Sequence, residues 1–492
     1  MTLGKRLKRY LYLTHRWLGV FMCLLFALWF VSGVIIMYVQ YPTLTEAQRI
    51  KNLPPLQPEQ IQLSAAEARQ RIALAGGSAQ SLRLSQLMGR PAYQLRGADN
   101  VPVTVFADTG EVLSGLTPEQ SLQVLRHSGF HDADSEPHYL GLVEMDQWTI
   151  SGSLHPSRPL HKVSVGDRAG TVVYVSDVSG QIVLDTNRQE RFWNWLGTTI
   201  HWIYPVQLRQ HPSLWAEVVI WLSVAGMVSV ITGGLIGFMR LRVRKPYRGK
   251  DVTPYQGVDK WHHVLGLASL IFLGTFMFSG LLSMSPWGLF SSGTSAGPQI
   301  QRYQGDSLGN LSAFPQPDSQ TLTDIREVDW RRIGDQPYLV LSASADQRFV
   351  LLPGGAREPA PAQPLHDLMQ KSLNRFIPEA SIVGITQLER FDNYYYSTHN
   401  RYRPLPALRV DFDDPENTSF YLDLNSGQVV LRHTDTSRLY RWLYNGLHSL
   451  DFIVLLDRRP LWDVVVLLLS VIGLVFSLTA VTIGWRRLLQ QL

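Results

Sequence analysis

The stretches T-H-R-W-L-G at residues 14–19 and W-H-H-V-L-G at residues 261–266 open the two copies of an internal repeat. They align His15 with His262 at an offset of 247 residues, and the same offset pairs His201 with His448. Further identical pairs lie along the whole unit: Ser32/Ser279, Gly33/Gly280, Tyr174/Tyr421, Gly180/Gly427, Trp195/Trp442, Trp215/Trp462, Gly226/Gly473 and Gly237/Gly484. The chain is therefore a duplicated unit that keeps histidine at two positions in each copy.

Four uncharged runs are long enough to cross a membrane as helices. They cover residues 18–39, 218–239, 264–289 and 464–485, and a helix needs roughly 20 apolar residues to cross the hydrocarbon core. The overall composition, 45% hydrophobic with a net charge of +5, hides them because it resembles that of a soluble protein. We expect the first run to be a membrane anchor, since it is too long for a cleaved signal peptide and no A-x-A site follows.

Basic residues predict the orientation. They gather in the N-terminal arm, in the loop 240–260 and at the C-terminus. Basic segments next to membrane spans stay in the cytoplasm. Both termini and this loop are therefore expected in the cytoplasm, and the long connections 43–190 and 290–438 outside it.

The two long connections have the pattern of mixed α+β modules. Residues 64–75 predict a helix that Ser64 and Glu67 cap, and residues 92–95 and 101–106 predict strands. Each connection ends in a predicted hairpin with a Ser-Gly tip, at 171–183 and 418–430. The one cysteine, Cys23, lies in the first apolar run, so we expect these modules to fold without disulfides.

Two short aromatic segments, 192–208 and 439–456, carry His201 and His448. They could be two further spans, which would give six. However, they are short, Arg441 and Asp451 interrupt the second, and crossing there would place the basic loop outside. We expect interfacial or partly re-entrant helices at the outer face, with tryptophans at the membrane boundary.

The repeat predicts how the histidines face each other. Each half contains an even number of spans, and such parallel repeats are related by an axis along the membrane normal. His15 is then expected to face His262 at cytoplasmic depth, and His201 to face His448 at the outer face. His263 aligns with Arg16, but an error in register would exchange it with His262.

Two facing imidazoles suit haem iron, because they fill both axial positions and favour electron transfer. Structural zinc wants four ligands. A proton relay, and histidines without a special role, are the alternatives. The chain has no G-x-G-x-x-G or P-loop fingerprint, so we expect it to bind neither a nicotinamide cofactor nor ATP, and we expect no nucleic-acid partner.

The chain resembles the PepSY-associated transmembrane proteins, which include bacterial inner-membrane ferric-siderophore reductases. The resemblance covers nearly the whole chain and rests on the two histidine stretches above, on D-N-Y-Y-Y at 392–396, on Y-L-D-L-N-S-G at 421–427 and on R-W-L-Y-N-G-L-H-S-L-D-F at 441–452. The first copy reads W-N-W-L-G-T-T-I-H-W-I-Y and lacks the Leu-Asp-Phe tail. The positions that match the family's histidines are His15, His201, His262 and His448.

The resemblance implies a membrane α-helical protein with four transmembrane helices in two parallel repeats and two periplasmic α+β PepSY-like modules. Two haem b groups would carry electrons from a quinol or a cytosolic reductase to a ferric siderophore or other ferric chelate. The expected divisions are 1–42 (arm and first span), 43–190 (first module), 191–240 (interfacial helix and second span), 241–260 (cytoplasmic loop), 261–289 (third span), 290–438 (second module) and 439–492 (interfacial helix and fourth span).

A few further residues are candidates for minor roles. Arg16 is a candidate partner of a haem propionate, with simple cytoplasmic anchoring as the alternative. His155 and His399, each upstream of an R-P-L, and the aromatic residues Tyr394 and Tyr395 are candidates for substrate contact. A solvated loop and a strand face are the plainer interpretations of these positions. The alternative for the whole chain is a non-redox accessory protein that regulates a peptidase or supports a transporter.

Overall fold

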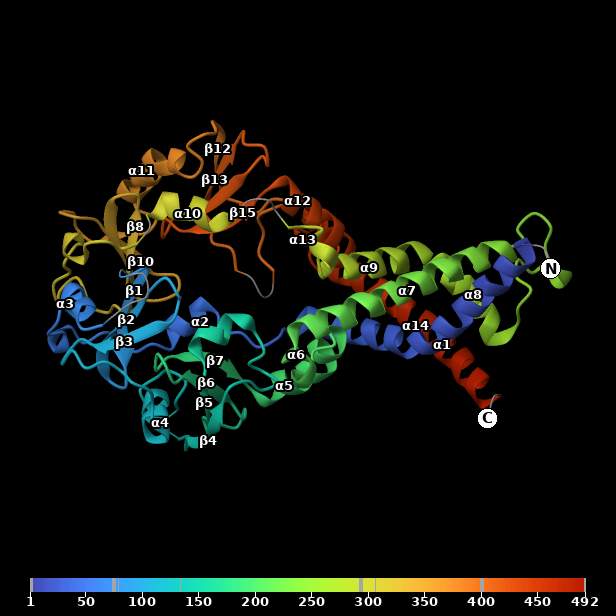
Figure 1. The fold of residues 1–492 in the computed structure, drawn as a ribbon, viewed down its shortest axis with the longest axis horizontal. Helices are drawn as coiled ribbons and strands as arrows, with labels where there is room; N and C mark the ends of the chain where they lie inside the picture. The colour runs from blue at the N-terminus through green and yellow to red at the C-terminus, as the bar shows by residue number, and fades with distance from the viewer. Residues whose placement is uncertain are drawn as a thin grey trace.

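The computed structural model describes residues 3–72, 77, 79–132, 134–291, 295–305, 307–398 and 402–490. The long helices form one end of an elongated molecule and carry both chain termini at its tip, whereas the β-sheets form the other end (Figure 1). These two parts are called the helical region and the sheet region below.

Within the described residues, three helices are long and apolar enough to cross a membrane: α1 (Leu3–Tyr38), α7 (Pro212–Arg240) and α14 (Leu461–Leu489). The fourth apolar run is divided into α8 (Gly257–Ala268) and α9 (Leu270–Ser283), which meet at a bend of 67°. The break falls at Ser269, whose hydroxyl donates to the carbonyl of Leu265 at 2.5 Å. A serine that bonds back in this way often bends a helix, although the same bond at Ser32 and Ser477 leaves α1 and α14 unbroken. The continuous helix expected over 264–289 is thus corrected to a bent pair that ends at Ser283.

The helices pack in a reciprocal arrangement. Helix α1 contacts both α14 and α7, while α9 packs on α7 and α8 packs on α14. Glycines allow these close contacts, because a side chain at Gly473 would collide with the ring of Phe30 and one at Gly226 with Met277. Small residues at such crossings are typical of helices that associate in membranes.

The two long connections share one sheet, which the sequence did not indicate. Strand β1 pairs antiparallel with β8, so that Leu82 lies opposite Trp330 and Arg83 opposite Asp329. The resulting sheet of seven strands has the order β11-β10-β9-β8-β1-β2-β3. Its strands are β1 (Ser81–Leu87), β2 (Arg90–Arg96), β3 (Pro102–Phe106), β8 (Glu327–Ile333), β9 (Gln336–Ser342), β10 (Arg348–Leu351) and β11 (Glu358–Pro359).

Each connection also builds a four-stranded sheet of its own. The first contains β4 (His138–Val143), β5 (Leu160–Ser164), β6 (Val172–Ser176) and β7 (Ile182–Thr186), and the second β12 (Ile382–Leu388), β13 (Ala407–Phe412), β14 (Ser419–Asp423) and β15 (Val429–His433). The expected hairpins are present as β6–β7 and β14–β15. Gly180 and Gly427 at their tips have φ of 72° and 70°, a conformation that glycine adopts at little cost.

Short helices cover the sheets: α2 (Glu46–Lys51), α3 (Ala65–Gln70), α4 (Pro118–Arg126), α10 (Ala296–Gln304) and α11 (Gln363–Ser372). Ser64 and Glu67 form the expected capping box of α3, although this helix ends earlier than expected and residues 73–76 lie outside the described part of the chain. One hydrophobic core includes residues of both connections, among them Leu82, Trp330 and Leu339. The two modules therefore fold as one body.

The short aromatic segments differ from the single helices expected over 192–208 and 439–456. Helix α5 (Arg188–Asn194) continues into a π-helical turn at Trp195–Thr199, and α12 (Asp435–Arg441) into one at Trp442–Gly446. Ile203 and Leu450, which are 247 residues apart, then adopt φ of 51° and 52°. A left-handed residue ends a helix, so α6 (Val206–Arg209) and α13 (Ile453–Leu456) are separate.

Candidate functional site

The terminal pair consists of His15 on α1 and His262 on α8, near the chain termini. Their ring centres are 6.5 Å apart and their planes are tilted by 36°. Nδ1 of His15 lies 3.1 Å from the carbonyl oxygen of Ser229, and Nδ1 of His262 lies 3.1 Å from the hydroxyl of Thr479. Four segments of the chain thus meet at this pair.

The sheet-side pair consists of His201 and His448, which follow the two π-helical turns. Their ring centres are 6.1 Å apart with the planes at 68°. Nδ1 of His201 lies 3.1 Å from the carbonyl of Trp29 and 3.1 Å from the hydroxyl of Ser32. Nδ1 of His448 has the corresponding partners, the carbonyl of Phe276 at 3.3 Å and the hydroxyl of Ser279 at 3.0 Å. π-Helical turns occur frequently at functional sites.

The partners of Nδ1 fix the tautomer of each ring. A carbonyl oxygen only accepts, so Nδ1 of His15, His201 and His448 carries the proton and donates it. Thr479 gives its own hydroxyl proton to Phe476 at 2.5 Å, so it also accepts from its histidine. None of the hydrogen bonds among the described residues uses Nε2 of these four rings. Each pair therefore leaves two basic nitrogens that no described residue engages, as in metal-binding histidines, whose other nitrogen is held by hydrogen bonding.

The spacing tests whether one metal ion fits between the rings. Two imidazoles bound on opposite sides of a metal at about 2 Å have ring centres roughly 6 Å apart. Both pairs, at 6.5 and 6.1 Å, agree with this value. The described residues contain no group of three or more His, Cys, Asp and Glu side chains that could hold a metal. A group such as haem, which brings its other four ligands, fits these pairs, whereas a zinc site with four protein ligands does not.

Glycines clear the space beside the rings. The Cε1 atoms of His201 and His448 lie 3.2 and 3.6 Å from where a Cβ of Gly33 and of Gly280 would stand, and Cε1 of His15 lies 2.7 Å from that of Gly233. A Cβ at Gly233 or Gly33 would press on the ring of His15 or His201, whereas one at Gly280 would only touch the ring of His448. Hence the repeated glycines at 33 and 280 permit the close approach of backbone and imidazole.

The structure distinguishes His262 from its neighbour. His263 is buried, and both of its nitrogens are engaged, Nδ1 with the hydroxyl of Thr253 at 2.7 Å and Nε2 with the carbonyl of Gly237 at 2.9 Å. It holds the loop after α7 against α8. His262, and not His263, faces His15. Arg16 is exposed on α1.

The residues expected at the substrate lie in different surroundings. His155 is exposed in a 3₁₀ turn at Gly152–Ser157, while His399 lies outside the described residues. The hydroxyl of Tyr394 accepts a hydrogen bond from Trp442 at 3.1 Å. Tyr395 is fully buried and stacks on Tyr421 with ring centres 5.0 Å apart. Tyr395 is therefore a core residue of its sheet, not a surface on which a substrate could lie.

Several residues of the site escaped the sequence analysis. Ser229 belongs to an apolar run and gives no signal, whereas Thr479 repeats Thr232, whose hydroxyl lies 3.4 Å from Nδ1 of His15. Ser32 and Ser279 were noticed as an identical pair without a role. The offset of 247 residues could have indicated that role, since Ser32 stands to His201 as Ser279 stands to His448.

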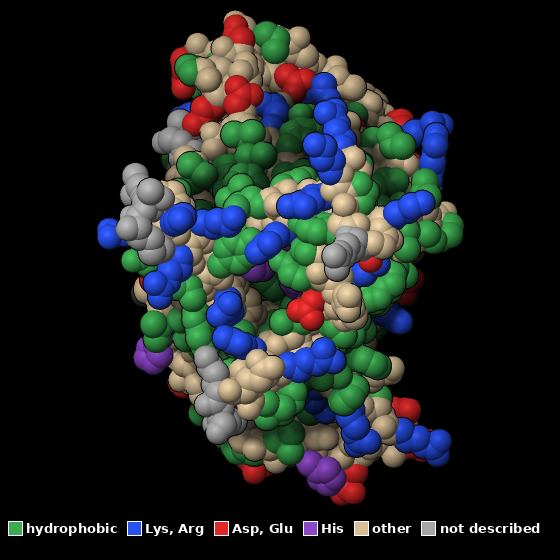
Figure 2. All heavy atoms as spheres, turned by 90° about the vertical axis from the view of Figure 1, so that its right-hand side faces the viewer, with side chains coloured by type: hydrophobic (Ala, Val, Ile, Leu, Met, Phe, Trp, Pro, Cys, Tyr) green, Lys and Arg blue, Asp and Glu red, His purple; other side chains and the backbone are tan. Residues whose placement is uncertain are grey.

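The tip of the helical region is rich in basic side chains. Figure 2 shows Lys and Arg gathered around a hollow in which histidine atoms are visible. Lys5, Arg6, Lys8 and Arg9 of α1 are exposed there. The tip of the helical region thus presents a basic surface.

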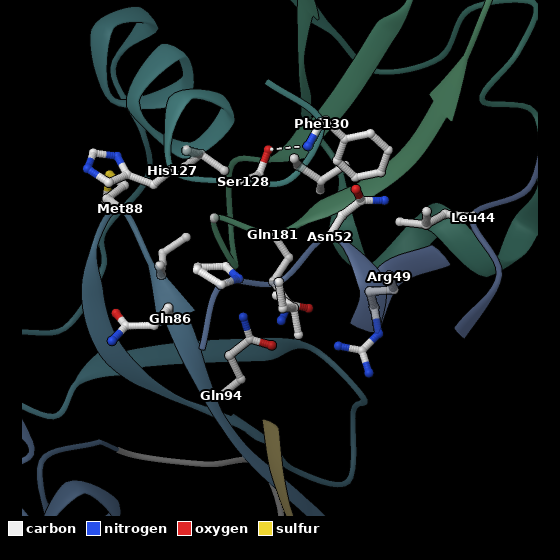
Figure 3. Close-up of a pocket in the computed structure, with 16 residues that line it drawn as sticks. Leu44, Arg49, Asn52, Gln86, Met88, Gln94, His127, Ser128, Phe130 and Gln181 are labelled. Carbon is white, nitrogen blue, oxygen red and sulfur yellow. Dashed lines mark hydrogen bonds between the residues drawn. The ribbon is translucent and has the colours of Figure 1, made fainter. Parts of the chain in front are cut away.

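The sheet region contains a small cavity. It lies between β1, β2 and the β6–β7 hairpin, where Gln86, Gln94 and Gln181 line it (Figure 3). The cavity has a volume of about 50 Å³, which is room for a few water molecules. It is too small for a metal chelate.

Together, the fold and the paired histidines define a helical membrane protein with about three apolar spans, a sheet-rich region and two two-imidazole sites. The model of one family, the PepSY-associated TM region, matches residues 12–487. The chain therefore belongs to the PepSY-associated transmembrane family. Comparison with curated proteins gave no match.

Proposed function

We propose that this protein carries electrons across the bacterial inner membrane through two haem b groups and reduces ferric iron, held by a siderophore or similar chelate, in the periplasm. The observation that carries the proposal is the presence of two histidine pairs with ring centres 6.5 and 6.1 Å apart, whose Nε2 atoms accept no hydrogen bond from the part of the chain that the structure describes. Bound between two imidazoles, haem supplies reversible one-electron transfer. A ferric substrate suits such a carrier, since oxygen-rich chelators hold ferrous iron much more weakly.

The chain's own residues hold and orient the sites. His15 and His262 would hold one group near the cytoplasm, and His201 with His448 the other near the periplasm. The carbonyls and hydroxyls at Nδ1 keep each Nε2 directed at its ligand and raise its basicity. Aromatic rings such as Phe476, stacked on His262 with ring centres 4.9 Å apart, exclude water from the site.

We further propose four spans, with the bent pair α8–α9 as the third, in two parallel repeats. Matching hydrogen bonds in the two halves support this arrangement. Trp215 donates to the carbonyl of Trp202 at 3.0 Å, and Trp462 donates to that of Ser449 at 2.9 Å. Both residue pairs are 247 residues apart. Such repeats are related by an axis along the membrane normal.

The register of the shared sheet supports the same axis. The residue that matches Leu82 in the second half is Asp329, and the residue that matches Trp330 in the first half is Arg83. The pair Leu82–Trp330 is therefore equivalent to the pair Arg83–Asp329. Both pairs exist side by side in the β1–β8 ladder. A two-fold axis that passes between them, and continues between the histidines of each pair, accounts for both observations.

The basic tip of the helical region supports a cytoplasmic position for both termini, because basic residues are retained on that side. The sheet region is then periplasmic, and the electron donor is a quinol or a cytosolic reductase. Reporter fusions after Arg244 and Leu492 should behave as cytosolic, and fusions at Gly110 and Gly355 as periplasmic. A periplasmic signal after Arg244 would contradict this topology.

The test of the function is a reduced-minus-oxidised visible spectrum of the purified protein, with haem quantified per chain. We expect a red protein with two haems that ferric chelate reoxidises. A colourless protein would favour the accessory role. If the protein retained haem but no ferric chelate reoxidised it, the haem sites would be supported and the proposed ferric substrate would be rejected.

A further inference from the structure

The sheet-side pair has a charged neighbour that the first half of the chain does not repeat. Arg441, Asp451 and Tyr396 form a cluster beside the second π-helical turn. At the positions 247 residues earlier stand Asn194, Tyr204 and Thr149. The duplicated unit therefore differs at all three places.

Arg441 is a buried cation, and two of its three side-chain nitrogens have no hydrogen-bond partner among the described residues. Its side chain is only 4% exposed, and it stacks over the ring of Trp442 at 4.1 Å. Nη2 donates to the carbonyl of Asp451. Among the described residues, Nε and Nη1 have no hydrogen-bond partner. Leaving charged donors buried and unsatisfied is costly.

The carboxylate of Asp451 does not take up these donors. No ion pair between Asp451 and Arg441 is found within 4.0 Å in the described part of the chain. Asp451 instead accepts a hydrogen bond from the hydroxyl of Tyr396 at 3.1 Å. Burial raises the pKa of Asp451, although Tyr396 and the nearby arginines act in the opposite direction. Two donors of Arg441 are thus taken up by none of the described residues.

The cluster is continuous with the sheet-side pair. Arg441 precedes His448 by seven residues, or roughly 10 Å along a helix axis, on the side toward the sheet region. Tyr444 lies between them, with its ring centre 5.5 Å from that of His448. Asn194 occupies the corresponding place before His201, but its amide is satisfied by the carbonyls of Gln40 and Glu190 and by Thr198. Of these two matching residues, Arg441 alone has cationic donors without a hydrogen-bond partner among the described residues.

We infer that Arg441 receives a carboxylate of the haem at the sheet-side pair, holding its propionate edge toward the periplasm. The inference rests on the proposed function. Haem carries both propionates on one edge, so it cannot obey the two-fold symmetry of the histidines. A single arginine on one side gives the group one preferred orientation, and a charge-assisted hydrogen bond to a carboxylate would satisfy the orphaned donors.

The test uses the full-length protein with His15→Ala, which should keep only the sheet-side haem. Arg441→Gln in this background should release haem to excess apomyoglobin roughly tenfold faster or more, because charge-assisted hydrogen bonds are lost. It should also lower the midpoint potential, since a buried cation favours the reduced group. Arg458→Gln is the matched control, because Arg458 is exposed near the same end of α14. In the His201→Ala background, which keeps the terminal haem, Arg441→Gln should change neither quantity.

A second probe does not depend on the folding of a variant. The probe is iron protoporphyrin dimethyl ester, in which both propionates are neutral. In the protein that keeps Arg441, the sheet-side pair should bind this ester more weakly than it binds haem. Arg441→Gln should bind the two probes alike, and Arg441→Lys should recover part of the difference. Equal binding of both probes with Arg441 in place would overturn the inference and leave the two haems standing. A protein that binds no haem at all would reject the proposed function and this inference together.

Discussion

The two halves of the chain hold their histidines alike but differ in what surrounds them. His201 and His448 each bond through Nδ1 to a carbonyl and a serine at matching positions. In contrast, α1 is unbroken while its counterpart is bent by 67°. The residues that fix the imidazoles are thus repeated at the sheet-side pair, whereas at the terminal pair His15 bonds to the carbonyl of Ser229 and His262 to the hydroxyl of Thr479. The halves also differ in the helix path and in the charge beside the sheet-side pair.

The largest effect should come from breaking one histidine in each pair. His15→Ala combined with His201→Ala is expected to remove both haems, because each site then has a single imidazole. His201→Ala combined with His448→Ala changes as many histidines, yet it should leave one haem. The pyridine haemochrome assay per mole of chain measures both. Equal haem content in the two double variants would show that the pairs are not independent sites.

The seam between the halves offers a stability test. Glu327 of β8 is buried and accepts two hydrogen bonds from Arg49, at 2.5 and 2.7 Å. Glu327→Ala removes the buried partner of Arg49 and leaves only the exposed Glu46, so it should destabilise the sheet region by about 3 kcal/mol. The matched position in the first half is Gln80, which is exposed, and Gln80→Ala should cost within roughly 0.5 kcal/mol. Thermal unfolding followed by circular dichroism compares them, and similar midpoints would refute the role of this seam.

A glycine distinguishes the two members of the terminal pair. A Cβ at Gly233 would stand 2.7 Å from Cε1 of His15, whereas the matching position in the second half is already Ala480. Gly233→Ala should displace the His15 ring and weaken haem binding at this pair by about tenfold, as changes around metal ligands do. Ala480→Gly is the control and should have little effect. Haem retention is measured during competition with apomyoglobin. If Gly233→Ala retained haem as well as the wild type, close packing at His15 would be refuted.

The smallest expected effect concerns pH and the hairpins. Burial raises the pKa of Asp185 to about 6, and Glu190 adds to the shift. The ordinary value is about 3.9, so the folded state binds more protons than the unfolded state between about pH 4 and 6. The stabilisation from protonated Asp185 is present below pH 4 and is lost as pH rises through 6.

Asp185→Asn should therefore flatten the fall in stability over this window and add about 1 kcal/mol at pH 7, reduced from the full shift because the group is partly exposed. The matched residue in the second half is Arg432, which pairs with Glu416 at 3.0 Å. Thermal midpoints of the wild type and the variant, measured from pH 4 to 7, test the sign. A variant with an unchanged slope would mean that Asp185 titrates normally in the folded protein.

What the sequence predicted depended on local or repeated signals. The sequence correctly predicted the hairpins around Gly180 and Gly427, the cap at Ser64 and three long apolar helices. Each of these features depends on a signal within one short segment: a turn residue, a capping box or an uncharged run. The facing of His201 and His448 followed from the offset of 247 residues, which carries information over long distances.

Other features had no such signal. The β1–β8 pairing joins strands from different halves, and strand patterns do not name their partner. The bend at Ser269 involves no proline, and bonding of serine back to the helix is not visible in a run of apolar residues. The burial of Tyr395 depends on stacking with Tyr421 across the sheet. Arg441 seemed only an interruption of an apolar segment, because its unused donors are visible only in three dimensions.

The central claim is that each site is built across the two halves, His15 with His262 and His201 with His448. The most direct measurement is the haem content and the spectrum of His15→Ala, of His262→Ala and of the double variant. We predict that all three retain about one haem per chain with the same spectrum and midpoint potential, because residues that act as a unit are not additive. If His15→Ala and His262→Ala retained haems with different spectra, and the double variant retained none, the histidines would pair along each half and the account would be wrong.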